Sequence, residues 1–244
     1  MPTETYEPII TADGSPSLKW RPTNEAMHNL QGAWSETCEI YLRAMDQVLS
    51  QTGELKVLSV GLGLGYNELL FAGLSCKYPH SSFYLESFEK DELLRKNFLL
   101  WLTGQPQQWP ELYMQIVQLV AEHFQISSQK IRTQILNLIQ TNKMILRQKL
   151  SSTTQFSRLM NCILYDPFSS NTNPELWQEL EVISILKNCA DTPCLLSTYA
   201  AKGALTRSLK ELQFNVEKCV GFGGKRQRTW ATRPFAAAVD HSQV

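Results

Sequence analysis

Three closely spaced glycines are the first residues whose arrangement suggests chemistry. Gly61, Gly63 and Gly65 follow the apolar run Lys56–Val60, and the next segment, Asn67–Cys76, has a helical pattern. A strand, a glycine loop and a helix start together present bare backbone amides and a positive helix end to a ligand. The GxGxG spacing departs from the GxGxxG of dinucleotide sites and is typical of loops that bind S-adenosylmethionine (SAM). A purely structural turn is the alternative.

An acidic residue follows this loop at the distance expected of a ribose contact. Glu89 comes after the predicted strand 82–88 and lies 24 residues beyond Gly65. A carboxylate at that point accepts hydrogen bonds from both ribose hydroxyls. Glu86 competes for the role, but we prefer Glu89 because Glu86 is expected to point sideways or into solvent. A solvated helix start is the alternative for either acid.

A second acid is predicted at the same edge of the sheet. Asp166 follows the predicted strand 160–165, and Pro167 and Phe168 come next. Ligands of open α/β sheets bind at the carboxyl ends of the strands. A primary amine is mostly protonated at neutral pH, so a carboxylate that takes its proton prepares it to attack a methyl group, and Phe168 offers a cation–π contact. Capping or tying of a loop is the alternative role for Asp166.

The elements that must position these residues alternate between strand and helix. The pattern predicts strands over 56–60, 82–88, 143–147, 160–165 and 194–198, with helices over 67–76, 90–102, 174–187 and 203–212. A helix over 24–51 capped by Asn24, two helices within 111–140, and a terminal hairpin of strands 214–220 and 228–232 complete the chain. This alternation is typical of a doubly wound α/β fold.

Composition excludes several classes of protein. The 244 residues are 43% hydrophobic and contain neither a low-complexity tract nor an apolar run of membrane-spanning length. The start of the chain lacks a secretory pattern, so we expect a cytoplasmic protein without membrane contact. Six scattered cysteines and four ungrouped histidines argue against a metal site.

Charge is distributed unevenly. Lys and Arg balance Asp and Glu at 23 each, but residues 187–244 hold nine basic against four acidic residues. That segment is net +5 and the first 186 residues are net −5, which favours an anionic partner for the C-terminal part.

Several stretches together resemble a known family, the MnmC-like tRNA methyltransferase domain in its stand-alone form. The resemblance covers roughly residues 17–232. It is carried by GLGLGYN at 61–67, SFEK at 87–90, DPFS at 166–169, NPELW at 173–177, STYA at 197–200 and GFGGKR at 221–226. It implies a Rossmann-like class I SAM-dependent methyltransferase with a mostly parallel seven-stranded sheet and an antiparallel terminal hairpin. The methyltransferase domain is then 54–244, with a helical insertion at about 105–142, after a lead-in and helix over 1–53.

The resemblance also implies a reaction. SAM is the cofactor, and tRNA is the partner whose wobble 5-aminomethyl(-2-thio)uridine becomes 5-methylaminomethyl(-2-thio)uridine. A flavin-dependent oxidase domain, which produces the amine in bifunctional relatives, does not fit in this length, so a separate enzyme is expected to supply the aminomethyl substrate.

The roles implied by the resemblance can be assigned residue by residue. Gly61, Gly63, Gly65, Glu89 and Glu25 would bind the cofactor, with His28 beside Glu25 over its methionine portion. Asp166 would touch the cofactor and, with Phe168, act on the amine. The substrate or RNA would contact Ser197, Tyr199, Lys225, Arg226 and Arg228, the basic residues as phosphate contacts or, alternatively, as a solvated strand edge.

One departure from the family pattern keeps alternatives open. Where an acid usually accepts from the adenine amino group, this chain has Arg147-Gln148-Lys149-Leu150-Ser151. Lysine cannot accept a hydrogen bond, so Gln148 or Ser151 would have to substitute. The alternatives are a SAM-dependent methyltransferase of another RNA or of a small amine, and a catalytically inactive binding module that uses helices 111–140.

Overall fold

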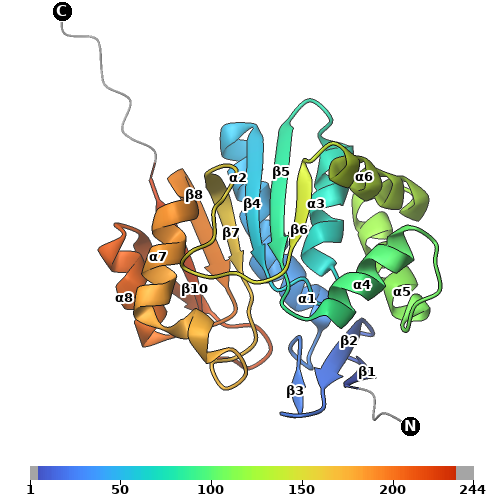
Figure 1. The fold of residues 1–244 in the computed structure, drawn as a ribbon, viewed down its shortest axis with the longest axis horizontal. Coiled ribbons are helices and arrows are strands. Elements are labelled where there is room, and N and C mark those ends of the chain that lie inside the picture. Colours follow the sequence, from blue (N-terminus) through green and yellow to red (C-terminus); the bar gives the residue numbers. More distant parts are fainter. Residues whose placement is uncertain (1–4, 235–244) are drawn as a thin grey trace, which may run out of the picture.

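The computed structural model describes residues 5–234 and is built around a seven-stranded sheet (Figure 1). In spatial order its strands are β6 (Met144–Arg147), β5 (Ser82–Phe88), β4 (Glu54–Val60), β7 (Met160–Tyr165), β8 (Ala190–Thr198), β10 (Gln227–Arg233) and β9 (Asn215–Val220). The first five are parallel, and β10 and β9 are antiparallel. The predicted mostly parallel sheet with a terminal antiparallel hairpin is confirmed.

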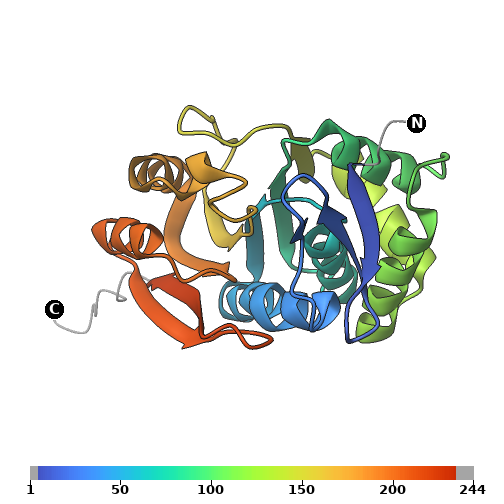
Figure 2. The same cartoon turned by 90° about the horizontal axis from the view of Figure 1, so that it is seen from below.

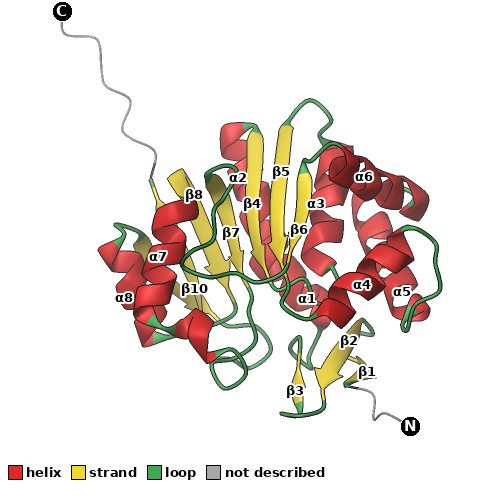
Figure 3. Cartoon of the chain, viewed as in Figure 1, coloured by secondary structure: helices red, strands yellow, loops and turns green. Residues whose placement is uncertain are grey.

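Helices cover both faces of this sheet (Figures 2 and 3). One face packs against α2 (Arg43–Thr52), α3 (Tyr66–Lys77), α4 (Glu92–Leu102), α5 (Pro110–Phe124) and α6 (Ser128–Gln140). The other packs against α7 (Glu179–Cys189) and α8 (Gly203–Glu211). Leu55 and Val57 of β4 lie in the first core and Leu58 and Val60 in the second, because successive side chains of a strand point to opposite faces. Because β6, β5, β4, β7 and β8 are parallel, their carboxyl ends all lie at the same edge of the sheet.

The N-terminal region differs from its prediction. A small antiparallel sheet of β1 (Tyr6–Ile10), β2 (Pro16–Trp20) and β3 (Glu25–Ala26) precedes the first helix. The predicted helix over 24–51 is wrong in its first turns: Asn24 has a φ of 58° and helix begins at Ala33, in α1 (Ala33–Thr37). A π-helical turn, Cys38–Leu42, links α1 to α2, which Gly53 ends in the left-handed conformation.

The turn between β1 and β2 explains why the helix begins at Ala33. Its side chains accept hydrogen bonds from the first helical amides: Thr11 Oγ1 from Ala33, Ser15 Oγ from Trp34, and Asp13 from Ser35 at 3.0 Å. The unpaired amides of a helix start need such acceptors. Three side chains of the preceding turn therefore supply the cap that the sequence pattern predicts from Asn24.

The remaining elements follow the predicted order with shifts of a few residues. The helix expected over 174–187 divides into a 3₁₀ turn, Pro174–Trp177, and α7. Helices α5 and α6 lie in the predicted insertion and pack on α3. The division of the chain at residue 53 stays a prediction.

None of the helices within residues 5–234 is long and apolar enough to cross a bilayer. Over the same range, no three His, Cys, Asp or Glu side chains are grouped to hold a metal ion.

Candidate active site

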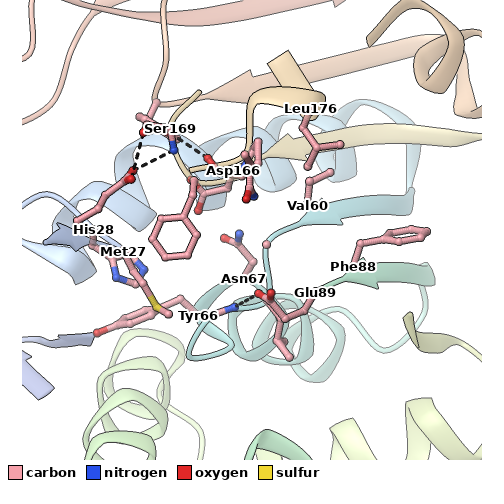
Figure 4. Close-up of a pocket in the computed structure, with 18 of the residues that line it drawn as sticks. Met27, His28, Val60, Tyr66, Asn67, Phe88, Glu89, Asp166, Ser169 and Leu176 are labelled. Atoms are coloured by element: carbon pink, nitrogen blue, oxygen red, sulfur yellow. Dashed lines mark hydrogen bonds between the residues drawn. The ribbon is translucent and has the colours of Figure 1, made fainter. Parts of the chain in front are cut away.

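A cavity of about 520 Å³ lies at the carboxyl ends of β4, β5 and β7, a size usual for small-molecule sites (Figure 4). Its walls come from segments that are distant in the sequence. They include residues 25–30, which begin in β3 of the small N-terminal sheet, residues 36–37, the glycine loop 61–63, residues 66–67 at the start of α3, the end of β5, residues 148–150, the loop after β7, Tyr199 and Lys225. Several of the residues predicted for the site therefore share one cavity.

The glycine loop needs its first glycine for close approach of two backbone segments. Gly61 has a φ of 95°, its amide donates to the Phe88 carbonyl at 2.9 Å, and a Cβ there would lie 2.5 Å from the Asp166 carbonyl oxygen. Gly63 has a φ of 52° and lines the cavity. Gly65 lies outside the lining: it precedes α3 with a φ of 78° and packs on the Phe98 ring. Gly65 thus shapes the turn without contacting a ligand in the cavity.

Glu89 lines the cavity beside this loop. Its Oε2 accepts from the Gly63 amide at 3.2 Å and its Oε1 from the Asp91 amide at 3.0 Å. Burial raises the pKa of Glu89, and the two amides oppose that shift. Each oxygen retains a lone pair for a diol. Glu86, its competitor, is fully buried instead of solvated and is paired with Arg147 at 2.8 Å.

Asn67, at the start of α3, adds a polar group that sequence analysis missed. The side chain points into the cavity (Figure 4), it is only 4% exposed, and its Oδ1 has no hydrogen-bond partner within residues 5–234. A buried acceptor without a partner is costly unless a ligand donates to it. The Gly63 backbone, the Glu89 carboxylate and this free acceptor fit a nucleoside that carries an ammonium group, as SAM does.

The expected adenine end of the cavity is built from less specific groups. Phe88 and Leu150 supply apolar surface, and Gln148 and Lys149 also line the cavity, whereas Ser151 is not part of the lining. Of the two substitutes considered for the missing acid, Gln148 therefore remains.

Asp166 is held against the glycine loop. Its amide donates to the Val60 carbonyl at 3.1 Å, and its side chain faces the cavity. Burial raises the pKa of Asp166 well above the usual value; Tyr41 and Lys225 oppose this shift, and Glu36 and Glu68 add to it. A carboxyl group with a raised pKa accepts a proton more readily than an ordinary aspartate.

Aromatic side chains fix the loop that follows Asp166. Tyr199 donates its hydroxyl to the Pro167 carbonyl at 2.9 Å, and Trp177 donates Nε1 to the Phe168 carbonyl at 2.8 Å. The rings of Phe168 and Trp20 pack at 6.2 Å between centroids. Phe168 and Tyr199 both line the cavity, which gives a cation two ring faces near Asp166.

Glu25 lines the cavity, but its carboxylate is engaged by the protein. It accepts from the Ser169 amide at 2.9 Å, the Ser169 hydroxyl at 3.1 Å and the Thr172 hydroxyl at 2.5 Å. These bonds tie β3 to the loop 166–173, and the role of Glu25 in binding the cofactor stays a prediction.

His28 lies beside Glu25 at the cavity wall and contacts Ser17 and Tyr66. Its Nδ1 is 2.8 Å from the Ser17 hydroxyl, and the Tyr66 ring meets it edge-on. Burial lowers the pKa of His28 to about 4, and the charge of Lys225 acts in the same direction. His28 is therefore neutral near pH 7.

Two of the predicted substrate or RNA contacts are buried in the fold. Ser197 is fully buried and donates its hydroxyl to the Ile40 carbonyl at 2.7 Å. Arg228 is 3% exposed, pairs with Glu39 at 2.9 Å and lies over the Trp230 ring. Ser197 on β8 and Arg228 on β10 lie on the face of the sheet that the helical segment 38–52 covers. Neither side chain can therefore reach a substrate in the cavity or a phosphate outside it.

The other two basic residues differ from each other. Lys225 lines the cavity and pairs with Glu36, so its ammonium group points inward instead of toward an RNA backbone. Arg226, the next residue, is exposed and outside the lining. Of the three predicted phosphate contacts, Arg226 is exposed, Arg228 is buried, and Lys225 is partly exposed and paired with Glu36.

Sequence analysis also missed the acids that surround Asp166. Glu36 is 5% exposed and lies within the predicted helix 24–51, and Glu68 is fully buried in the apolar α3. An acid within an apolar helical pattern was the available signal, since a carboxylate is rarely buried without a partner or a function.

Comparisons with known proteins agree with this geometry. A family model described as S-adenosyl-L-methionine-dependent methyltransferase matches residues 107–234. The tRNA 5-methylaminomethyl-2-thiouridine biosynthesis bifunctional protein MnmC of Hahella chejuensis is 29% identical over 71% of this chain and 27% of its own length. Its namesake in Cupriavidus necator is 26% identical over 98% of this chain and 36% of its own length. The chain thus spans about a third of these relatives or less.

Two solved structures share the fold. MnmC2 from Aquifex aeolicus has a TM-score of 0.67 and 23% identity, covering 96% of this chain and 73% of that one. Spermidine synthase from Thermotoga maritima has a TM-score of 0.53 and 10% identity, covering 95% and 70%. These similarities establish the class I methyltransferase-like sheet, and the family match covers more than half of the sequence. The chain therefore belongs to this family of S-adenosyl-L-methionine-dependent methyltransferases.

Proposed function

We propose that the chain transfers a methyl group from SAM to the amino group of 5-aminomethyl(-2-thio)uridine at the wobble position of tRNA. The product is 5-methylaminomethyl(-2-thio)uridine. Two observations support the proposal: the curated relatives carry the name of this biosynthesis, and the cavity holds an acid suited to activating an amine. The first observation carries the choice of an amine acceptor, because a buried carboxylate serves as a base for a hydroxyl group as well as for an ammonium group.

Asp166 does the essential work in this reaction. The aminomethyl group arrives as an ammonium ion and has no lone pair until one proton leaves. Bound SAM supplies an electrophilic methyl group on sulfur. Asp166 would take one proton from the ammonium group before the transfer, so that the nitrogen lone pair can attack the methyl carbon; S-adenosylhomocysteine would be the leaving group, and the product would be a secondary ammonium ion. Burial among other acids raises its pKa and makes it the better acceptor.

The remaining residues of the cavity bind the cofactor and orient the substrate amine. Gly63 and Glu89 hold the nucleoside part of the cofactor, and Asn67 accepts from its ammonium group. The ring of Phe168 limits where the substrate amine approaches. Glu25 holds the loop of Asp166 and Phe168 against β3, which closes one side of the cavity.

The proposal includes partners. Transfer RNA is the substrate, as indicated by the names of the curated relatives. The reaction belongs in the cytoplasm, where tRNA is matured.

Nucleoside mass spectrometry tests the function. Purified protein and SAM are incubated with tRNA that carries the aminomethyl nucleoside, and the digest is measured for the methylaminomethyl form. We expect conversion by the wild type and none by Asp166→Asn. Methylation of small amines or of another RNA alone would replace this function with one of the alternatives above. Absence of heat on titration with SAM would favour an inactive binding module.

A further inference from the structure

The ammonium group of Lys225 lies inside the cavity between an acid and an aromatic face. Its Nζ is 3.3 Å from Glu36 Oε1 and 4.4 Å from the centre of the Tyr199 ring. All three residues line the cavity with Asp166. A carboxylate and a ring face at these distances are the two groups that bind a primary ammonium ion most strongly.

The acidic and aromatic sides of this arrangement are fixed in place. The Glu36 side chain is only 6% exposed, and its other oxygen accepts from the Asn29 amide at 2.7 Å. The Tyr199 ring is held by the hydrogen bond from its hydroxyl to the Pro167 carbonyl. Groups that are already oriented bind a ligand without the cost of ordering them.

The cation, in contrast, is much more exposed than the acid beside it. The Lys225 side chain is 41% exposed and comes from the loop between β9 and β10, where Gly223 and Gly224 have φ values of 57° and 83°. Withdrawal of Lys225 would leave Glu36 buried without its cation. That state is costly unless another ammonium ion takes the position.

The lysine side chain ends in the same CH₂–NH₃⁺ group that the proposed substrate carries on its uracil ring. We propose that Glu36 and Tyr199 form the subsite for the aminomethyl group of the substrate, and that Lys225 fills this subsite until the substrate displaces it. The inference rests on the proposed function. It makes Glu36 a substrate-binding residue and gives Lys225 an inhibitory contact instead of a grip on RNA phosphate.

Binding of the free nucleoside tests the subsite without the rest of the tRNA. 5-Aminomethyluridine is titrated by calorimetry into protein saturated with S-adenosylhomocysteine. If Lys225 fills the subsite nine-tenths of the time, its removal in Lys225→Met gives about tenfold tighter binding. We expect Glu36→Gln to bind at least about tenfold more weakly, because a charged partner is lost. Lys218→Met, which removes an exposed charge from the same hairpin, is the matched control and should bind as the wild type.

Two results would overturn the inference. One is nucleoside binding by Lys225→Met that is unchanged or weaker than wild type. The other is an increase in the KM for tRNA with a flatter salt dependence in Lys225→Met, since that pattern belongs to a lost phosphate contact. Circular dichroism checks that each variant folds. If Lys225→Met does not fold, Lys225→Gln takes its place, and we expect the same tighter binding of the nucleoside.

The inference and the proposed function fail in different ways. A wild-type protein that never methylates aminomethyluridine in tRNA ends the proposed function. A wild-type protein that does so, while Lys225→Met gains no affinity for the nucleoside, ends only the subsite.

Discussion

The cavity has two halves that are built differently. The glycine-loop half, with Gly61, Gly63, Asn67 and Glu89, comes from two successive strand–helix units within 30 residues of sequence. The acidic half, with Glu25, Glu36, Asp166, Tyr199 and Lys225, gathers segments from both ends of the chain.

The two halves of the cavity depend on different interactions. The glycine-loop half depends on backbone conformation, since Gly61 lies against the Asp166 backbone and Glu89 is held by amides. The acidic half depends on the balance of charges among side chains. Steric changes should therefore damage the first half, and changes of charge the second.

The largest expected effect is on the acidic half. Asp166→Asn should lower the methylation rate by about 10³-fold, because the amide cannot accept the proton of the amine. SAM affinity should stay within about twofold of wild type, since the side chains of the glycine-loop half are intact. Single-turnover rates and calorimetry with SAM measure the two quantities. Parallel loss of both would move Asp166 into the cofactor site and remove the distinction between the halves.

The pH dependence of the same reaction sharpens this assignment. The base must be ionised, so the rate should rise with pH through the pKa of Asp166. Because burial raises that pKa, the acidic limb of the profile of kcat/KM should lie above the range of an ordinary aspartate. A limb at the usual aspartate value would contradict the predicted role of burial.

A smaller effect is expected in the glycine-loop half. Gly61→Ala forces an L-residue to a φ of 95° against a backbone oxygen and should weaken SAM binding about 10- to 100-fold. Gly104→Ala is the control, because Gly104 has a φ of 72° with open space around it. Equal SAM affinity in both variants would show that the close approach at Gly61 does not decide binding.

A still smaller effect is expected where the halves are joined. Glu25→Gln weakens the hydrogen bonds to Ser169 and Thr172, and it should reduce kcat/KM for tRNA about tenfold through a looser loop. Glu7→Gln on β1 of the same small sheet serves as the control. Unchanged kinetics of Glu25→Gln would mean that the carboxylate does not hold the loop in its working position.

A last expected effect concerns the free energy of unfolding, through a buried acid beneath the glycine loop. Burial raises the pKa of Glu68 to about 7, and the Ser87 hydroxyl opposes this. A raised pKa in the folded state gives stability that is present below the ordinary glutamate pKa and is lost as pH rises through about 7. Between pH 5 and pH 8 the free energy of unfolding of the wild type should therefore fall by up to about 3 kcal/mol because of Glu68. Urea unfolding of Glu68→Gln should lack this decrease. An unchanged slope would show that Glu68 does not titrate there.

The sequence by itself determined the alternation of strands and helices, the glycine loop and the positions of Glu89 and Asp166. These features are local, since a strand, the loop after it and the acid at its end lie within a few residues. Parallel strands then carry such ends to one edge of the sheet.

Which side chains of the acidic half are buried, and which groups they pair with, is known only from the three-dimensional structure. Asp13 starts the helix at Ala33, and Glu36 meets Lys225 across 189 positions. Arg228 and Ser197 lie on strands whose exposure depends on the helix packed over them. Contacts between distant segments decide which charges are buried, paired or free, and no periodicity or spacing along the chain records them.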